Sequence, residues 1–516
     1  MVDSIYAIGD TMWLILLFLA MPIGVYLTIR TRVLQLRLFP DMLRQLKGNG
    51  GTDGGDGGLT PFQALALTIG NRVGVGNIAG VATAVGFGGP GALFWMGLMA
   101  FFGGATAFVE STLAQIYKRR IDGELQGGVP YYLEKTTQKR WVGVVAAVVA
   151  LTLYTFLAPG VQATNIGVSA EYGIGIPTWV TATVITAGLG FIMWGGRRRV
   201  LRFVNVAVPI MACGYILMTA IVLAFNITAL PGAVVQIFSS AFGLDSVFGG
   251  IVGSAIAWGV RRALFSNVAG VGEGTYAAGA ADVSHPAKQG LVQAFSIYID
   301  TLGICLATGL MIVVTGAYNV VGGDGGMIQE NLAGVAAGPN YTQEAIATVS
   351  QPVAGPFLAI AIALFALTTI VAFYFIAEAN LAYLLGRRSP RLVRVLEVVI
   401  LAVTFYSTIA DAGIVWATAD IGYGTLGLIN FIALIFLSGI AITTLKDYDR
   451  QRAAGLDPVF DPVPLGIERA DFWEGPCSPA ALRAAGAEAQ SGRPVTTPSL
   501  ADRPAATTSE ARRPRT

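Results

Sequence analysis

A polar, glycine-rich break interrupts an apolar stretch of membrane length near residue 70. Within residues 68–80, Gly70, Gly74, Gly76 and Gly80 alternate with Asn71, Arg72 and Asn77. Glycines weaken a helix, and amide or guanidinium groups are costly in hydrocarbon unless they face a cavity or a ligand. In secondary transporters a broken helix offers N–H groups to an anionic substrate group and carbonyl oxygens to a coupling cation. The segment therefore predicts a binding site.

A second stretch, residues 247–283, has the same character. It is too long for one straight span, and a Gly-rich polar run at 261–274 follows four glycines. They are the second and the seventh predicted spans, five positions apart in the order of spans, so they are expected to cross the membrane in opposite directions. Matching broken helices in two inverted halves indicate the substrate site of a secondary transporter. Some of the glycines are explained by close helix packing alone, which we favour for Gly80, Gly88 and Gly89.

The composition is that of a membrane protein. Of 516 residues, 54% are hydrophobic and only 12% are charged, about half the charged share of a soluble domain. Windows of about 20 residues predict an all-α polytopic protein with about eleven transmembrane helices. The predicted spans are residues 12–29, 60–85, 91–117, 141–170, 177–196, 203–228, 247–283, 290–318, 352–386, 393–411 and 415–442.

Basic residues occupy every second connection between these spans. The intervening connections contain no Lys or Arg; they are residues 1–11, 86–90, 171–176, 229–246, 319–351 and 412–414. The positive-inside rule then places the N-terminus outside and the C-terminus in the cytoplasm, in a cell (plasma or inner) membrane. The net charge of +2 is a small sum of sorted charges and gives no reason to expect a nucleic-acid partner.

The predicted organisation has four parts. Residues 1–59 form an extra N-terminal helix and a Gly-rich cytoplasmic linker, 60–228 the first five-helix repeat, and 247–442 the second. Residues 443–516 are predicted to be a disordered cytoplasmic tail, since the chain from about 450 is rich in Pro, Ala, Arg and Ser.

Several runs resemble a known family. Residues 77–84 and 88–96 are similar to the signature of the alanine or glycine:cation symporters, the sodium:alanine symporter family. Further similar runs are 131–134, 264–267 with 269–270, 289–290 leading to 299–301, and 364–369 leading to 378–381. The resemblance covers about 60–440. It implies a LeuT-type fold of 5+5 inverted repeats with one extra N-terminal helix, and import of a small neutral amino acid, alanine or glycine, with sodium by alternating access.

The resemblance also implies a sodium site. Its ligands would be the carbonyl oxygens of Gly70, Val73 and Phe365 and the hydroxyls of Thr368 and Thr369, which suits a hard ion that prefers oxygen. The alternative is that both threonines only bond to carbonyls of their own helix. Sodium is the coupling ion, and no other cofactor is expected.

The substrate contacts come from both halves. N–H groups of Gly74, Val75, Gly76 and Asn77 are expected to bind the carboxylate. Carbonyls of the second broken helix and Gln162 would meet the ammonium group, with Asn267 and Trp416 completing the site. Asn165 is explained equally well as a polar contact between helices.

Four charged residues fall inside predicted spans: Arg72, Glu110, Glu273 and Asp300. Unpaired charges are costly there. We expect Glu110 and Asp300 to satisfy helix ends or polar networks. Arg72 and Glu273, one on each broken helix, are predicted to form a charge pair that links the two helices and contributes to gating.

The alternatives concern the coupling ion and the class of protein. Val268 stands where the family usually has an acid and Glu273 where it has a small residue, so a proton-coupled amino acid transporter of the same fold stays open. A passive channel would need a continuous polar pore. No catalytic or metal motif is found, so the chain is not expected to be an enzyme. No feature predicts an oligomeric state.

Overall fold

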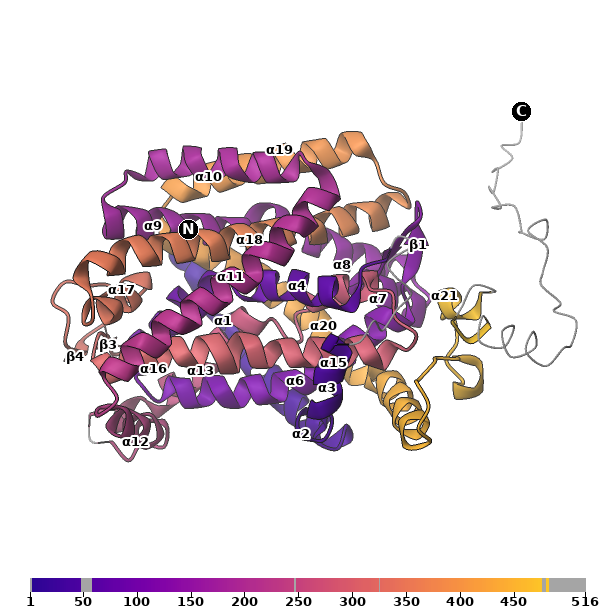
Figure 1. The fold of residues 1–516 in the computed structure, drawn as a ribbon, viewed down its shortest axis with the longest axis horizontal. Helices are drawn as coiled ribbons and strands as arrows, with labels where there is room; N and C mark the ends of the chain where they lie inside the picture. The colour runs from indigo at the N-terminus through magenta and orange to yellow at the C-terminus, as the bar shows by residue number, and fades with distance from the viewer. Residues whose placement is uncertain (1, 48–57, 246, 324, 476–478, 482–516) are drawn as a thin grey trace, which may run out of the picture.

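The computed structural model describes residues 2–47, 58–245, 247–323, 325–475 and 479–481. These residues form a helical bundle with two small β-hairpins (Figure 1). Most of the predicted Gly-rich linker and the chain from residue 482 onward lie outside the described residues.

Eight described helical segments are long and apolar enough to cross a membrane. They are α1 (Val2–Arg30), α6 (Ala92–Ile116), α8 (Arg140–Thr152) with η2 (Leu153–Leu157) and α9 (Ala158–Ile174), α11 (Gly196–Phe225), α15 (Pro286–Ile297) with η4 (Tyr298–Cys305) and α16 (Leu306–Thr315), α18 (Gln351–Leu385), α19 (Pro390–Ile409) and α20 (Ala412–Ala453). Each contains one predicted span. The prediction of an all-α polytopic membrane protein is confirmed.

The other three predicted spans are a short helix and two broken ones. The short helix is α10 (Thr178–Met193); the first broken helix is α4 (Pro61–Arg72), η1 (Val75–Asn77) and α5 (Ala79–Gly88), and the second is α13 (Val252–Asn267) and α14 (Gly274–Ala280). We call residues 73–78 the first break and residues 268–273 the second break.

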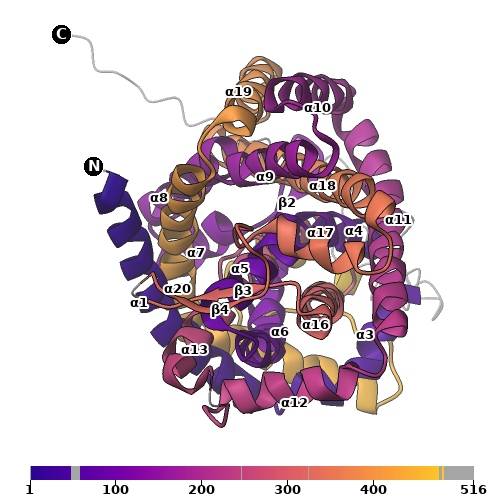
Figure 2. The same cartoon turned by 90° about the vertical axis from the view of Figure 1, so that its left-hand side faces the viewer.

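The two broken helices run antiparallel. Leu59, just before α4, forms a β-bridge with Ala281, just after α14: the Leu59 N–H donates to the Ala280 carbonyl and the Leu59 carbonyl accepts from the Asp282 N–H, both at 2.8 Å. At the other end, a Cβ atom on Gly88 of α5 would lie 3.2 Å from the Cα atom of Ala255 in α13. The start of one broken helix therefore lies beside the end of the other. In the end-on view, α5 lies near the centre, with α9, α11, α13 and α20 around it (Figure 2).

Short elements cover the two ends of the bundle. One end has α7 (Val129–Thr137), the hairpin β1 (Arg119–Ile121)–β2 (Glu124–Gln126) and α21 (Asp471–Glu474); α2 (Leu34–Arg37) and α3 (Phe39–Lys47) follow α1. The opposite end has α12 (Leu230–Ala241), η3 (Gly249–Ile251), the hairpin β3 (Asn319–Val321)–β4 (Met327–Glu330) and α17 (Pro339–Ala347).

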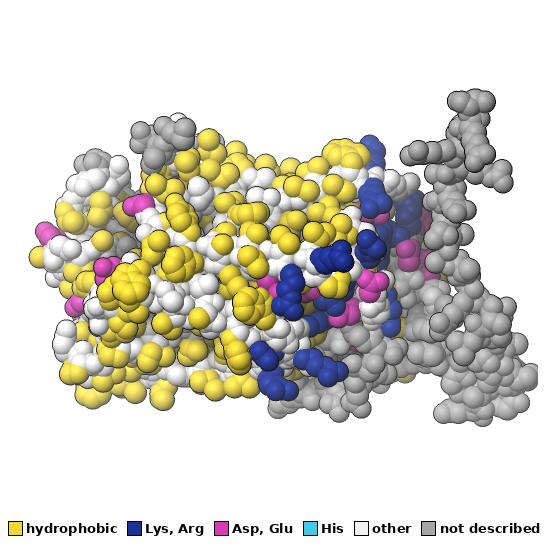
Figure 3. Space-filling model, turned by 90° about the horizontal axis from the view of Figure 1, so that it is seen from above, with side chains coloured by type: hydrophobic (Ala, Val, Ile, Leu, Met, Phe, Trp, Pro, Cys, Tyr) yellow, Lys and Arg dark blue, Asp and Glu magenta, His cyan; other side chains and the backbone are white. Residues whose placement is uncertain are grey.

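Lys and Arg side chains gather at the end with α7 and β1, and hydrophobic side chains cover most of the remaining visible surface (Figure 3). We call this the basic end. Its arginines are partly paired: Arg119 contacts Glu134 at 2.8 Å, and Arg388 contacts Glu124 at 2.5 Å. The broad apolar surface is what a lipid-facing protein needs.

The predicted disordered tail is partly ordered, which corrects the sequence interpretation. Helix α20 continues to Ala453, and the chain then forms η5 (Val463–Leu465) and α21 at the basic end. Trp473 is buried and donates its indole N–H to the Gln115 carbonyl at 2.9 Å. The aromatic side chains of this segment pack into a core. The prediction of disorder rested on the overall Pro- and Ala-rich composition and gave these aromatic residues no weight.

Candidate functional site

The first and second breaks lie side by side inside the bundle. A Cβ atom on Gly76 would lie 3.2 Å from the Phe265 ring and 3.5 Å from the Cα atom of Ser266. The Asp300 carboxylate accepts hydrogen bonds from Asn77 Nδ2 at 2.6 Å and from Ser266 Oγ at 3.1 Å. Asp300 on η4 thus links both broken helices, as expected for a buried carboxylate in a polar network.

Side-chain oxygens hold the first break in shape. The Gly74 N–H donates to Asn77 Oδ1 at 3.0 Å, and the Val75 N–H donates to Gln162 Oε1 at 3.0 Å. Gln162 comes from α9, across the bundle. The Asn77 N–H also donates to the Gly74 carbonyl at 3.2 Å, so three of the four backbone donors predicted for a substrate carboxylate already have acceptors in this structure.

The second break contains three residues with positive φ: Val268 at 46°, Gly270 at 91° and Gly272 at 99°. A β-branched residue such as Val268 rarely adopts this conformation, so the break stores backbone strain. Asn267 Oδ1 accepts from the Ala269 N–H at 3.0 Å, while Asn267 Nδ2 is buried without a partner among the described residues. Asn267 therefore offers a free donor beside the break.

Glu110 of α6 supports the second break. Its Oε2 atom accepts from the Gly270 N–H at 3.0 Å and from Asn430 Nδ2 at 3.0 Å. Asn430 also donates to the Gly270 carbonyl at 2.9 Å. The carboxylate acts here as an acceptor for an unwound backbone, which agrees with the structural role predicted for it.

Four oxygens predicted as sodium ligands come together between α4 and α18. Thr369 Oγ1 lies 2.9 Å from the Gly70 carbonyl oxygen and 2.9 Å from the Phe365 carbonyl oxygen. Thr368 Oγ1 lies 2.8 Å from the same Phe365 oxygen. We call these four atoms the oxygen cluster. Both threonines bond to the Phe365 carbonyl of their own helix, and Thr369 in addition bonds to the Gly70 carbonyl of α4.

The fifth predicted sodium ligand, Val73, follows directly on α4. Its φ and ψ of −79° and 79° leave the helical pattern, so its carbonyl no longer belongs to the α4 ladder. A Cβ atom on the next residue, Gly74, would lie 2.7 Å from Thr369 Oγ1. The end of α4 and the Thr369 hydroxyl are thus in close approach.

The predicted Arg72–Glu273 pair is wrong in this structure. No ion pair within 4.0 Å joins the two among the described residues; Glu273 accepts instead from Asn71 Nδ2 at 2.7 Å and from the Tyr423 hydroxyl at 3.2 Å. Arg72 donates to the Gln293 carbonyl at 3.1 Å and to the Ser296 hydroxyl, both on α15. Consecutive helical residues point about 100° apart, so Asn71 rather than Arg72 faces Glu273.

A cavity of about 530 Å³ lies at the end opposite the basic end. We call it the vestibule. Helices α1, α5, α9, α13 and α20 and the segment before α17 contribute its lining, including Asn165 and Trp416. The Trp416 and Phe265 rings are 4.8 Å apart. Trp416 thus lies in the vestibule, and Phe265 lies between Trp416 and the first break.

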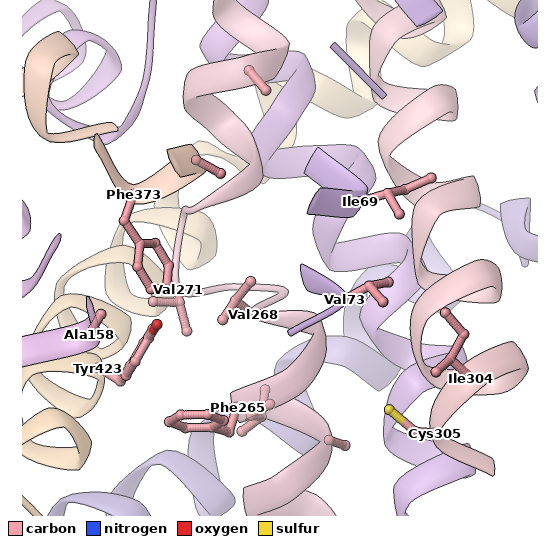
Figure 4. Close-up of a cluster of buried hydrophobic side chains, with 14 of the residues drawn as sticks. Ile69, Val73, Ala158, Phe265, Val268, Val271, Ile304, Cys305, Phe373 and Tyr423 are labelled. Carbon is pink, nitrogen blue, oxygen red and sulfur yellow. The ribbon is translucent and has the colours of Figure 1, made fainter. Parts of the chain in front are cut away.

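Apolar side chains surround the breaks. Figure 4 shows Phe265, Val268, Val271 and Tyr423 around the second break, with Val73 on the first broken helix nearby. All five are buried. The breaks therefore lie in apolar surroundings, apart from the amide and carboxylate groups described above.

Two discontinuous antiparallel helices that meet inside a bundle of apolar helices define a multi-pass membrane transporter. The chain matches the family described as "Sodium:alanine symporter family" over residues 1–462. It therefore belongs to this family, which is a family of transporters and not of enzymes.

Curated relatives share most of the chain. It is 48% identical over 477 residues to a putative sodium/proton-dependent alanine carrier protein, YrbD, of Bacillus subtilis, covering 92% of this chain and 98% of the relative. It is 38% identical to the probable sodium/glutamine symporter GlnT of the same species, covering 88% and 91%. It is 33% identical to the sodium/alanine symporter AgcS of Methanococcus maripaludis, covering 85% and 94%.

Solved structures are more distant. MhsT in complex with L-phenylalanine aligns with a TM-score of 0.48 at 16% identity, covering 83% of this chain and 98% of that chain.

Proposed function

We propose that the chain imports a small neutral amino acid, alanine or glycine, together with sodium by alternating access. The observation that carries the proposal is the oxygen cluster at the end of the broken helix α4, where the Thr369 hydroxyl reaches the Gly70 and Phe365 carbonyls. The relatives described as sodium- or sodium/proton-dependent alanine carriers support it.

The chemistry of the cluster favours a monovalent hard cation. Its atoms are neutral carbonyl and hydroxyl oxygens, which replace the water shell of a hard ion. No carboxylate belongs to the cluster, so its charge suits sodium better than a divalent cation. We assign Gly70, Val73, Phe365, Thr368 and Thr369 as its ligands.

The substrate would bind between the two breaks. The free Asn267 Nδ2 group and the N–H groups of Gly76 and Asn77 are the proposed donors to its carboxylate. In the present structure Gln162 Oε1 accepts from the Val75 N–H. If the substrate carboxylate took this N–H, Gln162 Oε1 would become available to accept from the substrate ammonium group. Gly74 has no side chain and therefore lets the Thr369 hydroxyl lie close to the first break. Val73, Val268 and Phe265 leave room only for a small side chain.

The proposed orientation decides which side of the membrane the vestibule faces. The positive-inside rule places the basic end in the cytoplasm, with the N-terminus outside and the C-terminus inside. The vestibule then opens toward the outside, and Trp416 and Phe265 lie on the path from it to the breaks. Movement of the Phe265 ring would connect the vestibule to the substrate site.

Proton coupling is the second candidate. Glu273 is a buried carboxyl group between Asn71 and Tyr423, and it is the group that would take a transported proton. A fixed positive charge in place of sodium is the other route to such a mechanism. Arg72 binds α15 instead of the oxygen cluster, which favours sodium.

Uptake by proteoliposomes tests the proposal. Labelled alanine and glycine are offered under an inward sodium gradient, with potassium and pH gradients as matched controls. We expect accumulation that depends on sodium. Accumulation driven by the pH gradient alone would favour the proton-coupled alternative, and no uptake of either amino acid would overturn the proposed substrate.

A further inference from the structure

Two adjacent arginines of α13 line the vestibule with unequal charge partners. Arg261 contacts two carboxylates, Asp10 at 2.8 Å and Asp420 at 2.5 Å. Arg262 has no ion pair within 4.0 Å among the described residues. The two arginines and the two aspartates have a total charge of zero, but Arg261 pairs with both aspartates and Arg262 pairs with neither.

Arg262 is held among aromatic rings. Its guanidinium carbon lies 4.6 Å from the Trp416 ring centre, 5.1 Å from that of Trp258 and 5.7 Å from that of Phe265. The side chain is only 5% exposed, and its Nε and Nη1 atoms are buried without a hydrogen-bond partner among the described residues. Cation–π contacts offset only part of the cost of desolvating a charged group with unmade hydrogen bonds.

Asp420 offers the complementary open group. Its Oδ2 atom is taken by Arg261, while Oδ1 is buried without a partner among the described residues. Asp420 and Arg262 both line the vestibule, from α20 and α13. Two side chains that line the cavity therefore carry buried guanidinium donors and a buried carboxylate oxygen that have no hydrogen-bond partner among the described residues.

We propose that the vestibule contains a second binding site for a zwitterionic amino acid, separate from the site between the breaks. Its carboxylate would bind the Arg262 guanidinium, and its ammonium group would bind Asp420 Oδ1. The choice of an amino acid as occupant rests on the proposed function. A volume of about 530 Å³ is within the usual range of ligand pockets, so one small amino acid fits with water.

The vestibule site would hold an amino acid before it moves to the substrate site between the breaks. A solute bound there lies against Trp416 and Phe265, the rings that separate the vestibule from the first break. Because none of its groups belongs to the oxygen cluster, binding in the vestibule is independent of sodium.

Equilibrium binding of labelled alanine to the purified full-length chain tests the proposal. With sodium present, we expect two molecules per chain at saturation; with choline in its place, we expect only the vestibule molecule. Arg262→Gln and Asp420→Asn lose the sodium-independent molecule, whereas Thr369→Ala loses the sodium-dependent one. Arg44→Gln, on an exposed side chain of α3, is the matched control and binds both.

A second measurement, on the wild-type chain, tests the vestibule site even if Arg262→Gln or Asp420→Asn fails to fold. Choline acetate added to the wild-type chain is expected to change tryptophan fluorescence saturably, because Arg262 stacks on Trp258 and Trp416, while choline chloride is not. Arg262→Lys, which keeps the charge but not the planar fork, should need at least about tenfold more acetate.

The outcomes separate the two proposals. The vestibule site is overturned if the wild-type chain binds only one alanine and binds none without sodium. It is also overturned if choline chloride changes the tryptophan fluorescence as choline acetate does. If sodium-driven uptake is absent but the acetate response depends on Arg262, the vestibule site is supported and the proposed transport function fails.

Discussion

The proposed coupling of transport to sodium depends most directly on one side chain, that of Thr369. Thr369→Ala removes one proposed sodium ligand and, among the described residues, the only side-chain bond that joins α18 to the Gly70 carbonyl in the oxygen cluster. Hydrogen bonds to charged groups contribute about 1.5–3 kcal/mol, so we expect the sodium concentration for half-maximal uptake to rise at least about tenfold. Uptake at varied sodium measures this.

Thr404→Ala is the control for that change. Thr404 is also a buried membrane threonine that bonds to its own helix, at 2.8 Å from the Ile400 carbonyl, but it reaches no broken helix. Its sodium dependence should match that of the wild type. Equal sodium dependence in Thr369→Ala would exclude the oxygen cluster as the coupling site.

Glu273 distinguishes the two coupling ions. Glu273→Gln keeps the shape of the side chain but cannot exchange a proton at transport pH. If sodium alone is coupled, sodium-driven alanine uptake stays within a few fold of wild type and its dependence on pH becomes flatter. The measurement is uptake between pH 5.5 and 8.5 under a constant sodium gradient. Loss of all uptake, with the protein still folded, would instead assign the coupling to Glu273.

The polar contacts of single residues were the least predictable part of the site. The sequence identified the unusual charges Arg72 and Glu273, but which one of Asn71 and Arg72 faces Glu273 depends on the rotation of α4 about its axis. The pairing of Asn77 with Asp300 was missed for a different reason. Asn77 and Asp300 are far apart in the chain and become neighbours only when η1 packs against η4.

At the scale of elements, the breaks require glycine at particular positions. Gly270 has φ of 91°, and a Cβ atom there would lie 2.2 Å from the Phe431 ring. We expect Gly270→Ala to lower the free energy of unfolding by about 2–5 kcal/mol through backbone strain and overpacking. Thermal unfolding in detergent measures the change.

Gly253→Ala is the matched control on the same broken helix. A Cβ atom there has no other atom within 4 Å, and Ala is favoured over Gly inside a helix by about 1 kcal/mol. The melting temperature of Gly253→Ala should therefore equal or exceed that of wild type. Equal melting temperatures for both variants would show that the second break does not need glycine.

The transmembrane helices and the two breaks were predictable because each follows from the residues of its own segment. An apolar stretch of about 20 residues must be helical in a membrane, so all eleven spans could be located, and glycines interleaved with polar residues located both breaks. Helix α12 and the hairpins were not predicted, since their short sequences carry no such pattern. Neither was the position of Trp416 in the vestibule, which depends on how α20 packs against α13.

For the whole molecule, the C-terminal segment closes the basic end. Trp473→Ala removes a buried ring and its hydrogen bond to Gln115, so we expect a cost of about 3–5 kcal/mol. Val463→Ala, in the same segment but 74% exposed, should have little effect. Thermal unfolding of both variants tests this. A Trp473→Ala variant as stable as wild type would show that the segment only rests on the surface.

The same segment has a consequence for how the chain is made. Trp473 covers the carbonyl of Gln115, from which it is separated by 358 residues, and the Phe472 ring lies 4.3 Å from the Lys118 ammonium group. Synthesis begins at the N-terminus, so Gln115 and Lys118 are in place long before their aromatic cover exists. The basic end is therefore completed late in synthesis, and a ribosome that stops short of residue 472 releases a bundle with this end uncovered.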